Sequence, residues 1–265
     1  MNESTRKDWD AYSDAYFSKG TAEDYDIIAN APERAFPTEV WEMLRAALPD
    51  LRGKRVLVPS SGDNLAAFGF CLLGADVTST DLSDNQLANA KKIADTRGWN
   101  VKFQQADSMT LDGLPDGEFD LVYTSQGVHV WISDLTMMYR SFNRVLKPGG
   151  QYVFFDTHPF TRPFDDSGSE IKIIKDYRDV GPFNEVPEHH WRVEDFLRSL
   201  IAAGFTIEDY RDLHSSSADL LNYDYIYYGE YGNYAAREAD GGARYNWRNN
   251  PWAALPQKIT ASAKK

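Results

Sequence analysis

Short apolar runs of strand type alternate with segments of helical periodicity along this chain of 265 residues, and this alternation strongly limits the possible folds. The strand-type runs are RVLVP (55–59), ADVTST (75–80), VKFQQ (101–105), FDLVYT (119–124), QYVFFD (151–156), FTIEDYRD (205–212) and QKITASAK (257–264). Strands that alternate with helices indicate units in which successive strands lie parallel. The chain is therefore expected to form an α/β fold with a doubly wound, mostly parallel, seven-stranded sheet.

Helix boundaries are legible between several of these strands. Ser83 and Gln86 have the spacing of a capping box, and Gly98 is well placed to end the helix that follows. A second helix is expected from Ser133 up to the KPGG sequence at 147–150. A third helix follows Trp191, and its expected apolar face consists of Val193, Phe196, Leu197, Leu200 and Ile201.

Composition limits the classes of partner. Hydrophobic residues make up 42% of the chain and aromatic residues 14%, which is enough for a substantial core. The 40 acidic side chains outnumber the 28 basic ones, and the resulting formal charge of −12 repels nucleic acid. No apolar run approaches the roughly 20 residues that cross a bilayer, and the polar N-terminus lacks the apolar segment of a signal peptide. We therefore expect a cytoplasmic monomer or homodimer without a nucleic-acid or membrane partner.

The strand pattern predicts a single domain with segments added to its minimal core. The expected division is an N-terminal lid (1–36), a cofactor-binding core (37–156), an insertion (157–192), a second core segment (193–212), an aromatic-rich insertion (213–255) and a C-terminal edge strand (256–265). The aromatic-rich insertion holds six of the 15 tyrosines between residues 223 and 234. Aromatic side chains with polar tips suit a cover over an organic substrate; the alternative is an insertion that packs on itself or forms a dimer contact.

Polar residues follow the ends of the first three strands. The turn after the first strand, at residues 60–64, reads SSGDN, while Asp81 ends the second strand and Asp107 follows the third. Ligands of doubly wound sheets bind beyond the carboxyl ends of the strands, where the strand order reverses. The Asp81 carboxylate could accept both hydroxyls of a ribose, and Asp107 could accept the exocyclic amine of an adenine. Their order along the chain predicts an adenosine-binding site.

The turn at residues 60–64 restricts which adenosine compound fits. A dinucleotide needs the glycines of G-x-G-x-x-G, and a triphosphate needs a glycine-rich loop that ends in Lys-Ser or Lys-Thr; the turn has neither pattern. S-adenosylmethionine carries no phosphate, and its site needs one close backbone approach together with polar groups for the methionyl ammonium and carboxylate. Gly62, with serine, aspartate and asparagine neighbours, meets that requirement. We therefore expect S-adenosylmethionine as the cofactor.

Five motifs taken together resemble the class I S-adenosylmethionine-dependent methyltransferases over roughly the whole chain. They are VLVPSSGDN (56–64), TSTDLS (78–83), QQADSMTL (104–111), FDLVYTSQGVHVW (119–131) and VLKPGGQYVFFD (145–156). The segment WDAYSDAYF (9–17) is similar to the N-terminal lid helix of many small-molecule members. The chain departs from the family pattern where Val58 replaces an acid and where Ser60 and Asn64 replace two glycines. Asp63 is the expected substitute for the missing acid.

The predicted cofactor site collects residues that follow the first four strands, and two tyrosines of the lid helix are expected to close over it. Its members are Tyr12, Tyr16, Ser60, Ser61, Gly62, Asp63, Asn64, Asp81, Leu82, Gln86, Asp107, Ser108, Met109, Ser125 and Gln126. Ser125 and Gln126 are expected beneath the methionyl part, because they end the fourth strand.

The methyl acceptor is expected at the same edge of the sheet. A base is needed there only where the acceptor must lose a proton. His129, just past the fourth strand, is the candidate catalytic base, and a purely structural loop histidine is the alternative. The candidate substrate contacts are Trp131, His158, Tyr177 and His190. No metal site is expected, because the adjacent His189 and His190 would point apart on a strand.

These observations predict S-adenosylmethionine-dependent methyl transfer to a small-molecule acceptor with an oxygen or nitrogen nucleophile. The depleted first motif keeps a second class open, a non-catalytic protein that binds S-adenosylmethionine or S-adenosylhomocysteine as a sensor or scaffold. An NAD(P)-binding reductase is disfavoured, because the glycines that a pyrophosphate requires are missing.

Overall fold

A seven-stranded sheet runs through the computed structural model, which describes residues 3–17, 22–62, 64–165, 171–183, 187–214, 246–249 and 251–265. Its strands are β1 (Arg55–Pro59), β2 (Asp76–Asp81), β3 (Val101–Gln105), β4 (Phe119–Ser125), β5 (Leu146–Thr157), β6 (Thr206–Leu213) and β7 (Lys258–Lys264). The helices are α1 (Glu3–Phe17), α2 (Ala22–Asn30), α3 (Thr38–Ala47), α4 (Leu65–Leu72), α5 (Asp84–Arg97), α6 (Leu135–Val145) and α7 (Val193–Ala202). Short 3-10 turns are η1 (Pro32–Ala35), η2 (His129–Trp131), η3 (Pro159–Thr161) and η5 (Pro251–Ala254).

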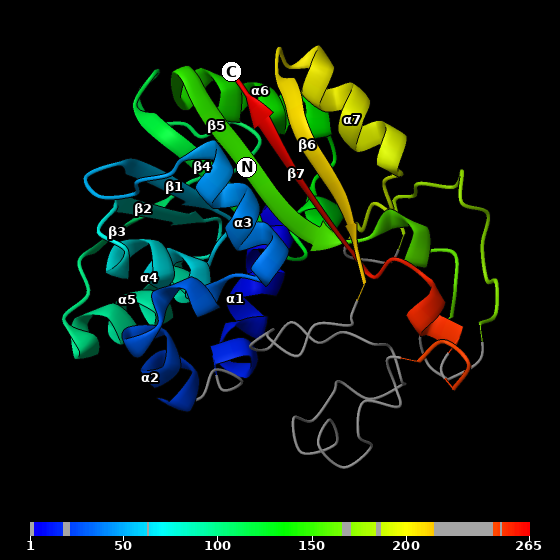
Figure 1. Cartoon of the computed structure of the whole chain (residues 1–265), viewed down its shortest axis with the longest axis horizontal. Coiled ribbons are helices and arrows are strands. Elements are labelled where there is room, and N and C mark those ends of the chain that lie inside the picture. The colour runs from blue at the N-terminus through cyan, green and yellow to red at the C-terminus, as the bar shows by residue number, and fades with distance from the viewer. Residues whose placement is uncertain are drawn as a thin grey trace.

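The strand order is β3-β2-β1-β4-β5-β7-β6, and the first five strands along the chain are parallel. Only β7 runs antiparallel to its neighbours, β5 and β6. The order reverses between β1 and β4, which is where doubly wound sheets bind their ligands. The predicted fold class, a doubly wound and mostly parallel sheet of seven strands, is confirmed (Figure 1).

The expectation that the C-terminal strand forms an edge is wrong. β7 lies between β5 and β6, with Ala261 beside Phe154 on one side and beside Tyr210 on the other. Six of its seven residues are buried, and Thr, Ala and Ser provide most of its side chains. Such short side chains fit a strand that is covered on both faces, whereas β6, with mostly half-exposed or exposed residues, takes the edge.

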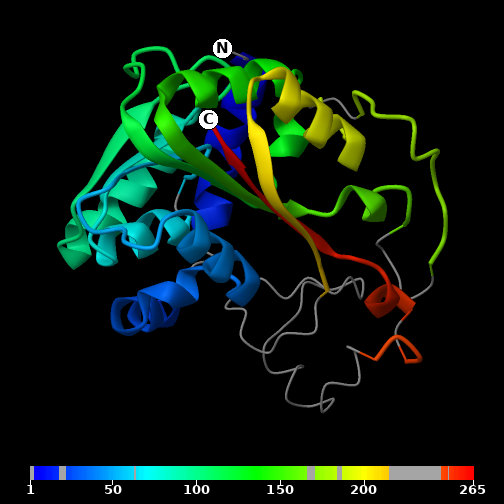
Figure 2. The ribbon, with the colours of Figure 1, turned by 45° about the horizontal axis from the view of Figure 1, so that its top comes forward.

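Helices cover both faces of the sheet. α6 and α7 lie on one side, and α2, α3 and α4 lie on the other (Figures 1 and 2). β1 shows how the sequence supports this arrangement, because Val56 and Val58 join one hydrophobic cluster and Leu57, which points to the opposite face, joins the other. No helix in the described ranges is long and apolar enough to span a bilayer.

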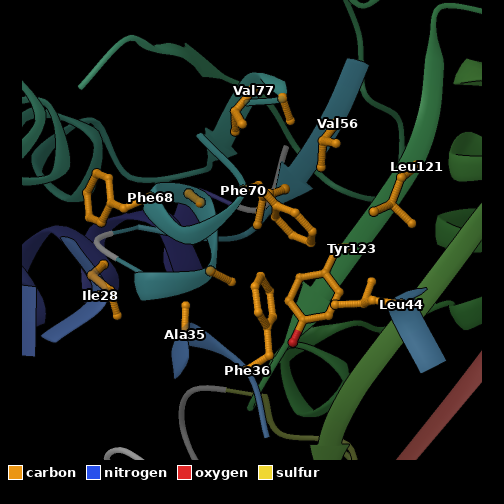
Figure 3. Packing of buried hydrophobic residues seen from close by; sticks show 14 of the residues in the cluster. Ile28, Ala35, Phe36, Leu44, Val56, Phe68, Phe70, Val77, Leu121 and Tyr123 are labelled. Atoms are coloured by element: carbon orange, nitrogen blue, oxygen red, sulfur yellow. The ribbon is translucent and has the colours of Figure 1, made fainter. Parts of the chain in front are cut away.

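The cluster under α2, α3 and α4 is organised around aromatic side chains. Phe36, Phe70 and Tyr123 meet at its centre (Figure 3), and the ring of Phe36 lies 4.7 Å from that of Phe70 and 5.6 Å from that of Tyr123. Tyr123 comes from β4 and Phe70 from α4, while Phe36 follows η1. These contacts hold the N-terminal helices against the half of the sheet that carries β1 and β2.

Most predicted helix signals are confirmed. The Ser83 hydroxyl accepts a hydrogen bond from the Gln86 backbone N–H, and Gly98 ends α5 with a left-handed φ of +70°. The apolar face expected for α7 was too wide, since Phe196 and Leu200 are buried but Ile201 is 64% exposed. α7 packs on α6 and β6 through a narrow stripe, and Ile201 lies outside it.

A matched pair of isoleucines tests this packing. Ile28 on α2 is fully buried and Ile201 on α7 is largely exposed. Ile28→Ala should lower the free energy of unfolding by about 2–5 kcal/mol, because it removes core contacts and leaves a cavity. Ile201→Ala should change it by less than about 0.5 kcal/mol. Denaturant unfolding followed by circular dichroism measures both, and equal losses would contradict the placement of α2.

Candidate active site

The turn after β1 brings the ends of β1 and β2 together. Gly62 has a left-handed φ of +47°, and its N–H donates a hydrogen bond to Asp81 Oδ2 at 3.0 Å. A Cβ atom added at Gly62 would lie 2.8 Å from Oε1 of the buried Gln86. Glycine is therefore required at this position for its backbone conformation and for the close approach of Gln86.

Asp81 joins that turn to the start of α5. Its Oδ1 accepts a hydrogen bond from the backbone N–H of Ser83 at 2.9 Å, while Oδ2 accepts the one from Gly62. The neighbouring Leu82 carbonyl accepts a hydrogen bond from Gln105 at the end of β3. The carboxylate is thus held at the carboxyl edge of the sheet by two backbone amides.

The Asn64 side chain makes two hydrogen bonds that a glycine could not make. Its Oδ1 caps α4 by accepting a hydrogen bond from the Ala66 N–H, and its Nδ2 donates to the Ser125 hydroxyl at 2.6 Å. One side chain therefore ties the start of α4 to the end of β4. The departure of the first motif from the family's glycines is explained here by this bridge.

Four serine hydroxyls, in two pairs, extend the connections at the same edge. Ser60 and Ser108 hydroxyls lie 2.6 Å apart, and those of Ser61 and Ser79 lie 2.7 Å apart. Ser60 follows β1 and Ser108 follows β3, so the first pair links the ends of the two strands that flank β2. With the contacts of Gly62 and Asn64, a continuous polar network joins the carboxyl ends of β1, β2, β3 and β4.

Asp107 and Met109 continue the network beyond β3. Asp107 Oδ1 accepts a hydrogen bond from the Met109 N–H at 2.9 Å, which closes a turn over the end of β3. The Met109 thioether lies 3.5 Å from the Ser133 hydroxyl, in the segment that leads into α6. Gln126, after β4, has a left-handed φ of +37° and a buried Oε1 without a hydrogen-bond partner in the described residues.

The N-terminal helix α1 crosses this edge. Asp10 Oδ1 accepts a hydrogen bond from the Ser83 hydroxyl at 2.6 Å, and the Ser13 hydroxyl accepts one from Asn89 on α5. The Trp9 ring meets the Trp131 ring edge-on at 5.5 Å, so α1 reaches from α5 to η2. The side chains of Tyr12 and Tyr16, together with Asp63, lie outside what the structure describes.

A buried histidine–aspartate pair lies at the ends of β4 and β5. His129 Nδ1 is 2.5 Å from Asp156 Oδ2, and the two side chains are 3% and 4% exposed. The imidazole packs between aromatic rings, 4.5 Å from that of Phe196 and 5.0 Å from that of Phe154. Its Nε2 is buried and has no hydrogen-bond partner among the described residues.

Asp156 has the donor environment of an ionised carboxylate. It accepts hydrogen bonds from the backbone N–H groups of Gly127, His129 and Thr157 as well as from the His129 ring. Burial raises the pKa of Asp156, but hydrogen bonding and the charge of His129, with the amide donors, outweigh burial and hold it at about 2. An ionised carboxylate only accepts, so the proton between the two residues belongs to His129 Nδ1.

Asp156 was not among the residues predicted from the sequence. It ends β5 as Asp81 ends β2, so the search for acids at strand ends would have found it. The neighbouring Lys258, on β7, was also missed. Its ammonium donates to the Thr157 hydroxyl at 3.1 Å, and burial lowers the pKa of Lys258 to about 7.

A second histidine–aspartate pair lies on the same rim but has both ring nitrogens engaged. His158 Nδ1 accepts a hydrogen bond from the Phe160 N–H at 3.1 Å and thereby caps η3. With that nitrogen used as an acceptor, Nε2 carries the proton and donates to Asp212 Oδ1 at 3.0 Å. Burial lowers the pKa of His158, which favours this neutral ring.

The other predicted substrate contacts are spread along the insertion. The Tyr177 hydroxyl accepts a hydrogen bond from the Val193 N–H at the start of α7. The His190 ring packs 4.6 Å from the Phe183 ring, and burial lowers the pKa of His190 to about 4. Of the predicted contacts, Trp131 lies nearest to His129 along the chain, as the last residue of η2.

A small pocket opens beside His129, beyond the ends of β4 and β5. Its lining consists of His129, Val130, Asp156, Thr157, Pro159, Arg162, His189, Trp191 and Phe196. The insertion forms one wall, because the His189 N–H donates to the Val130 carbonyl at 2.7 Å and Trp191 Nε1 donates to the Ile132 carbonyl at 2.9 Å. No cluster of three metal-ligating side chains occurs in the described ranges.

Comparison with known proteins adds independent observations. The family described as "Methyltransferase domain" matches residues 58–154, which run from the last two residues of β1 to Phe154 in β5. The demethylmenaquinone methyltransferase of Thermus thermophilus is 36% identical over 86 residues, 32% of this chain and 38% of that protein. The malonyl-[acyl-carrier protein] O-methyltransferase of Legionella pneumophila is 30% identical over 63% of this chain and 56% of that protein. Matches to the curated relatives thus span between 32% and 58% of their own lengths.

Solved structures extend the likeness to most of the chain. The S-adenosylmethionine-dependent methyltransferase of Mesorhizobium loti superposes with a TM-score of 0.59 at 23% identity, and covers 85% of this chain and 97% of its own. That likeness shows the fold, and the family match places the motifs of β1, β2 and β4 within it. With the polar network at the strand ends, these findings agree with the resemblance of the five sequence motifs. Residues 58–154 therefore match the family described as "Methyltransferase domain", within a fold that this chain shares with a solved S-adenosylmethionine-dependent methyltransferase.

Proposed function

We propose that this protein transfers a methyl group from S-adenosylmethionine to a small-molecule acceptor. One observation carries the proposal, the polar network that joins the carboxyl ends of β1 to β4 around the close turn at Gly62. Demethylmenaquinone and ubiquinone methyltransferases among the relatives support a small acceptor. Because the chain covers only part of the length of those relatives, we do not assign their substrates to it.

The residues of the network fit the parts of S-adenosylmethionine. Gly62 turns the chain sharply after β1, and Asp81 places a carboxylate beside it for the ribose hydroxyls. Asp107 and Ser108, after β3, would face the adenine. The Asn64–Ser125 bridge lies at the switch point between β1 and β4, where the methionyl part would rest. When bound, S-adenosylmethionine supplies a methyl group that is already activated by its cationic sulfur.

The chain's own contribution is to orient the acceptor and to exclude water. α1 lies across the strand ends and is held there by Asp10 and by the contact of Trp9 with Trp131. A closed cover of this kind shields the reacting centre from solvent, and orientation alone can supply much of the acceleration in such a displacement.

His129 is the proposed base for an acceptor that must lose a proton. In the neutral ring, with its proton on Nδ1 beside Asp156, the Nε2 lone pair would be the acceptor. Nε2 belongs to a residue that lines the pocket beside β4 and β5, so an acceptor in that pocket could donate its proton there. Asp156 would act as the positioning residue, since it fixes the tautomer and the ring orientation.

A non-catalytic sensor or scaffold remains the second class. It would need the cofactor network but not the buried His129–Asp156 pair. Nothing in the fold of the described residues favours it, and the buried pair beside a pocket favours catalysis.

Cofactor binding is tested by calorimetry with S-adenosylmethionine, S-adenosylhomocysteine and NADH. Both adenosyl compounds should bind and NADH should not. Asp81→Ala should reduce the free energy of S-adenosylhomocysteine binding by about 1.5–3 kcal/mol, the range for a hydrogen bond to a charged group. Asp76→Ala, at the opposite end of β2, is the matched control and should leave the dissociation constant unchanged. Equal affinities in the two variants would place the ribose elsewhere.

The proposed base is tested once a mass-spectrometric screen has found an acceptor that gains a methyl group. His129→Ala and Asp156→Asn should each lower turnover by roughly 10²-fold or more while S-adenosylhomocysteine still binds. Asp212→Asn removes the carboxylate charge from the other histidine–aspartate pair. Turnover in this variant should stay within about 3-fold of the parent enzyme, far from the roughly 10²-fold loss expected for His129→Ala.

Nitrogen NMR of labelled histidines separates positioning from a folding defect. His129 should carry its proton on Nδ1 in the parent protein, and Asp156→Asn should change this tautomer without unfolding the chain. Normal turnover in folded Asp156→Asn would remove Asp156 from the mechanism. Normal turnover in His129→Ala would show that orientation and desolvation suffice.

A further inference from the structure

The small pocket beside His129 is lined by nitrogen-bearing polar side chains together with two aromatic ones. Arg162 and His189 from the insertion line it together with His129. Trp191 and Phe196 supply aromatic surface on the side of α7. The free space in the pocket is about that of one water molecule, so it fits a single polar atom of a ligand and not a whole molecule.

Two buried nitrogens in this pocket have no hydrogen-bond partner. They are His129 Nε2 and His189 Nδ1, and the absence holds for the part of the chain that the structure describes. Leaving a buried polar atom unsatisfied costs about 1–3 kcal/mol, so native proteins rarely retain such atoms without a role. Both nitrogens belong to side chains that line the same pocket, where a water or a polar atom of a ligand could satisfy them.

Arg162 adds positive charge at this place. No carboxylate among the described residues lies within ion-pair distance of its guanidinium, although acidic groups outnumber basic ones in the chain by 40 to 28. Other arginines of the region are paired, as Arg178 is with Asp176 and Arg192 with Asp195. After burial, the charge of Arg162 contributes to the low pKa of His190, so the guanidinium acts on the same wall of the pocket.

We propose that this pocket binds an acidic oxygen of the methyl acceptor, a carboxylic acid or a phenol carried on a flat apolar body. Arg162 would pair with the oxygen's negative charge and His189 would donate a hydrogen bond to it. The inference rests on the proposed function, because it names the acceptor class of that same site.

The chemistry balances without a further reactant. A phenolic O–H bond breaks and its proton moves to His129 Nε2, while a carboxylate arrives already deprotonated. The oxygen–methyl bond forms as the sulfur–methyl bond breaks, and the electron pair of that bond stays on sulfur. The anion thereby becomes a neutral ether or ester, which no longer pairs with Arg162 and can leave.

An amine acceptor fits this pocket less well. A protonated amine would face the Arg162 guanidinium, and like charges repel at short range in a site sheltered from water. The pocket therefore favours an oxygen acceptor over a nitrogen acceptor.

Benzoate and benzylamine are suitable probes, since they share a ring and differ in the sign of their charge. Each is titrated into the full-length protein, with and without S-adenosylhomocysteine, and followed by calorimetry. Benzoate should bind and benzylamine should not. Arg162→Gln should lower the affinity for benzoate by about 10-fold or more, the equivalent of one charged hydrogen bond. The control Arg178→Gln changes an exposed, paired arginine of the same insertion and should leave benzoate affinity unchanged.

Phenol distinguishes the two acceptor classes. Methyl transfer to phenols predicts that phenol binds and depends on His129, whereas transfer to carboxylates predicts that only benzoate binds. Equal benzoate affinity in Arg162→Gln and the parent, or no benzoate binding at its solubility limit, would overturn the proposal. Loss of S-adenosylhomocysteine binding with benzoate binding retained would count against the proposed function and leave the pocket assignment standing.

Discussion

The hydrogen bond from the Gly62 N–H to Asp81 Oδ2 is the contact on which the arrangement of the site depends. It requires a left-handed glycine at the turn and a carboxylate at the end of the neighbouring strand. Parallel strands present their carboxyl ends at one edge, so this contact and the Asn64–Ser125 bridge gather residues from the ends of three strands, β1, β2 and β4, at a single place. Without a side chain at Gly62, Gln86 can close behind the turn.

The two histidine–aspartate pairs differ in whether the histidine keeps a ring nitrogen that could accept a proton. In the pair of His158 with Asp212, both ring nitrogens are used, one to cap a turn and one to bond the carboxylate. In the pair of His129 with Asp156, the carboxylate takes one nitrogen and leaves the other buried beside a pocket. The difference lies in the backbone. The Phe160 N–H reaches His158, whereas aromatic rings surround His129 and offer it no donor.

Local signals in the sequence predicted much of the fold. The capping of α5 by Ser83 and Gly98 and the positions of the strands depend on neighbours in the chain, and these predictions hold. The placement of β7 depends on pairing with strands far away in sequence, which its short side chains did not reveal. Strand-end acids located Asp81 and would have located Asp156. The use of both His158 nitrogens could not be predicted, because Asp212 meets it only after β6 and β7 have paired.

The central position of β7 sets the order in which the chain can be completed during synthesis. Residues 1–157 contain the first five strands and can begin to fold as they emerge, because N-terminal elements precede C-terminal ones on the ribosome. About 100 further residues must be synthesised before Lys258–Lys264 can pair with the outer edge of β5, and until then the backbone groups of that edge have no partner strand. β6 emerges earlier yet pairs only with β7, so it has no partner in the sheet until the last strand arrives. The half of the sheet that would bind the cofactor can thus form first. The surroundings of Asp156 on β5 are completed last, when β7 brings Lys258 beside it.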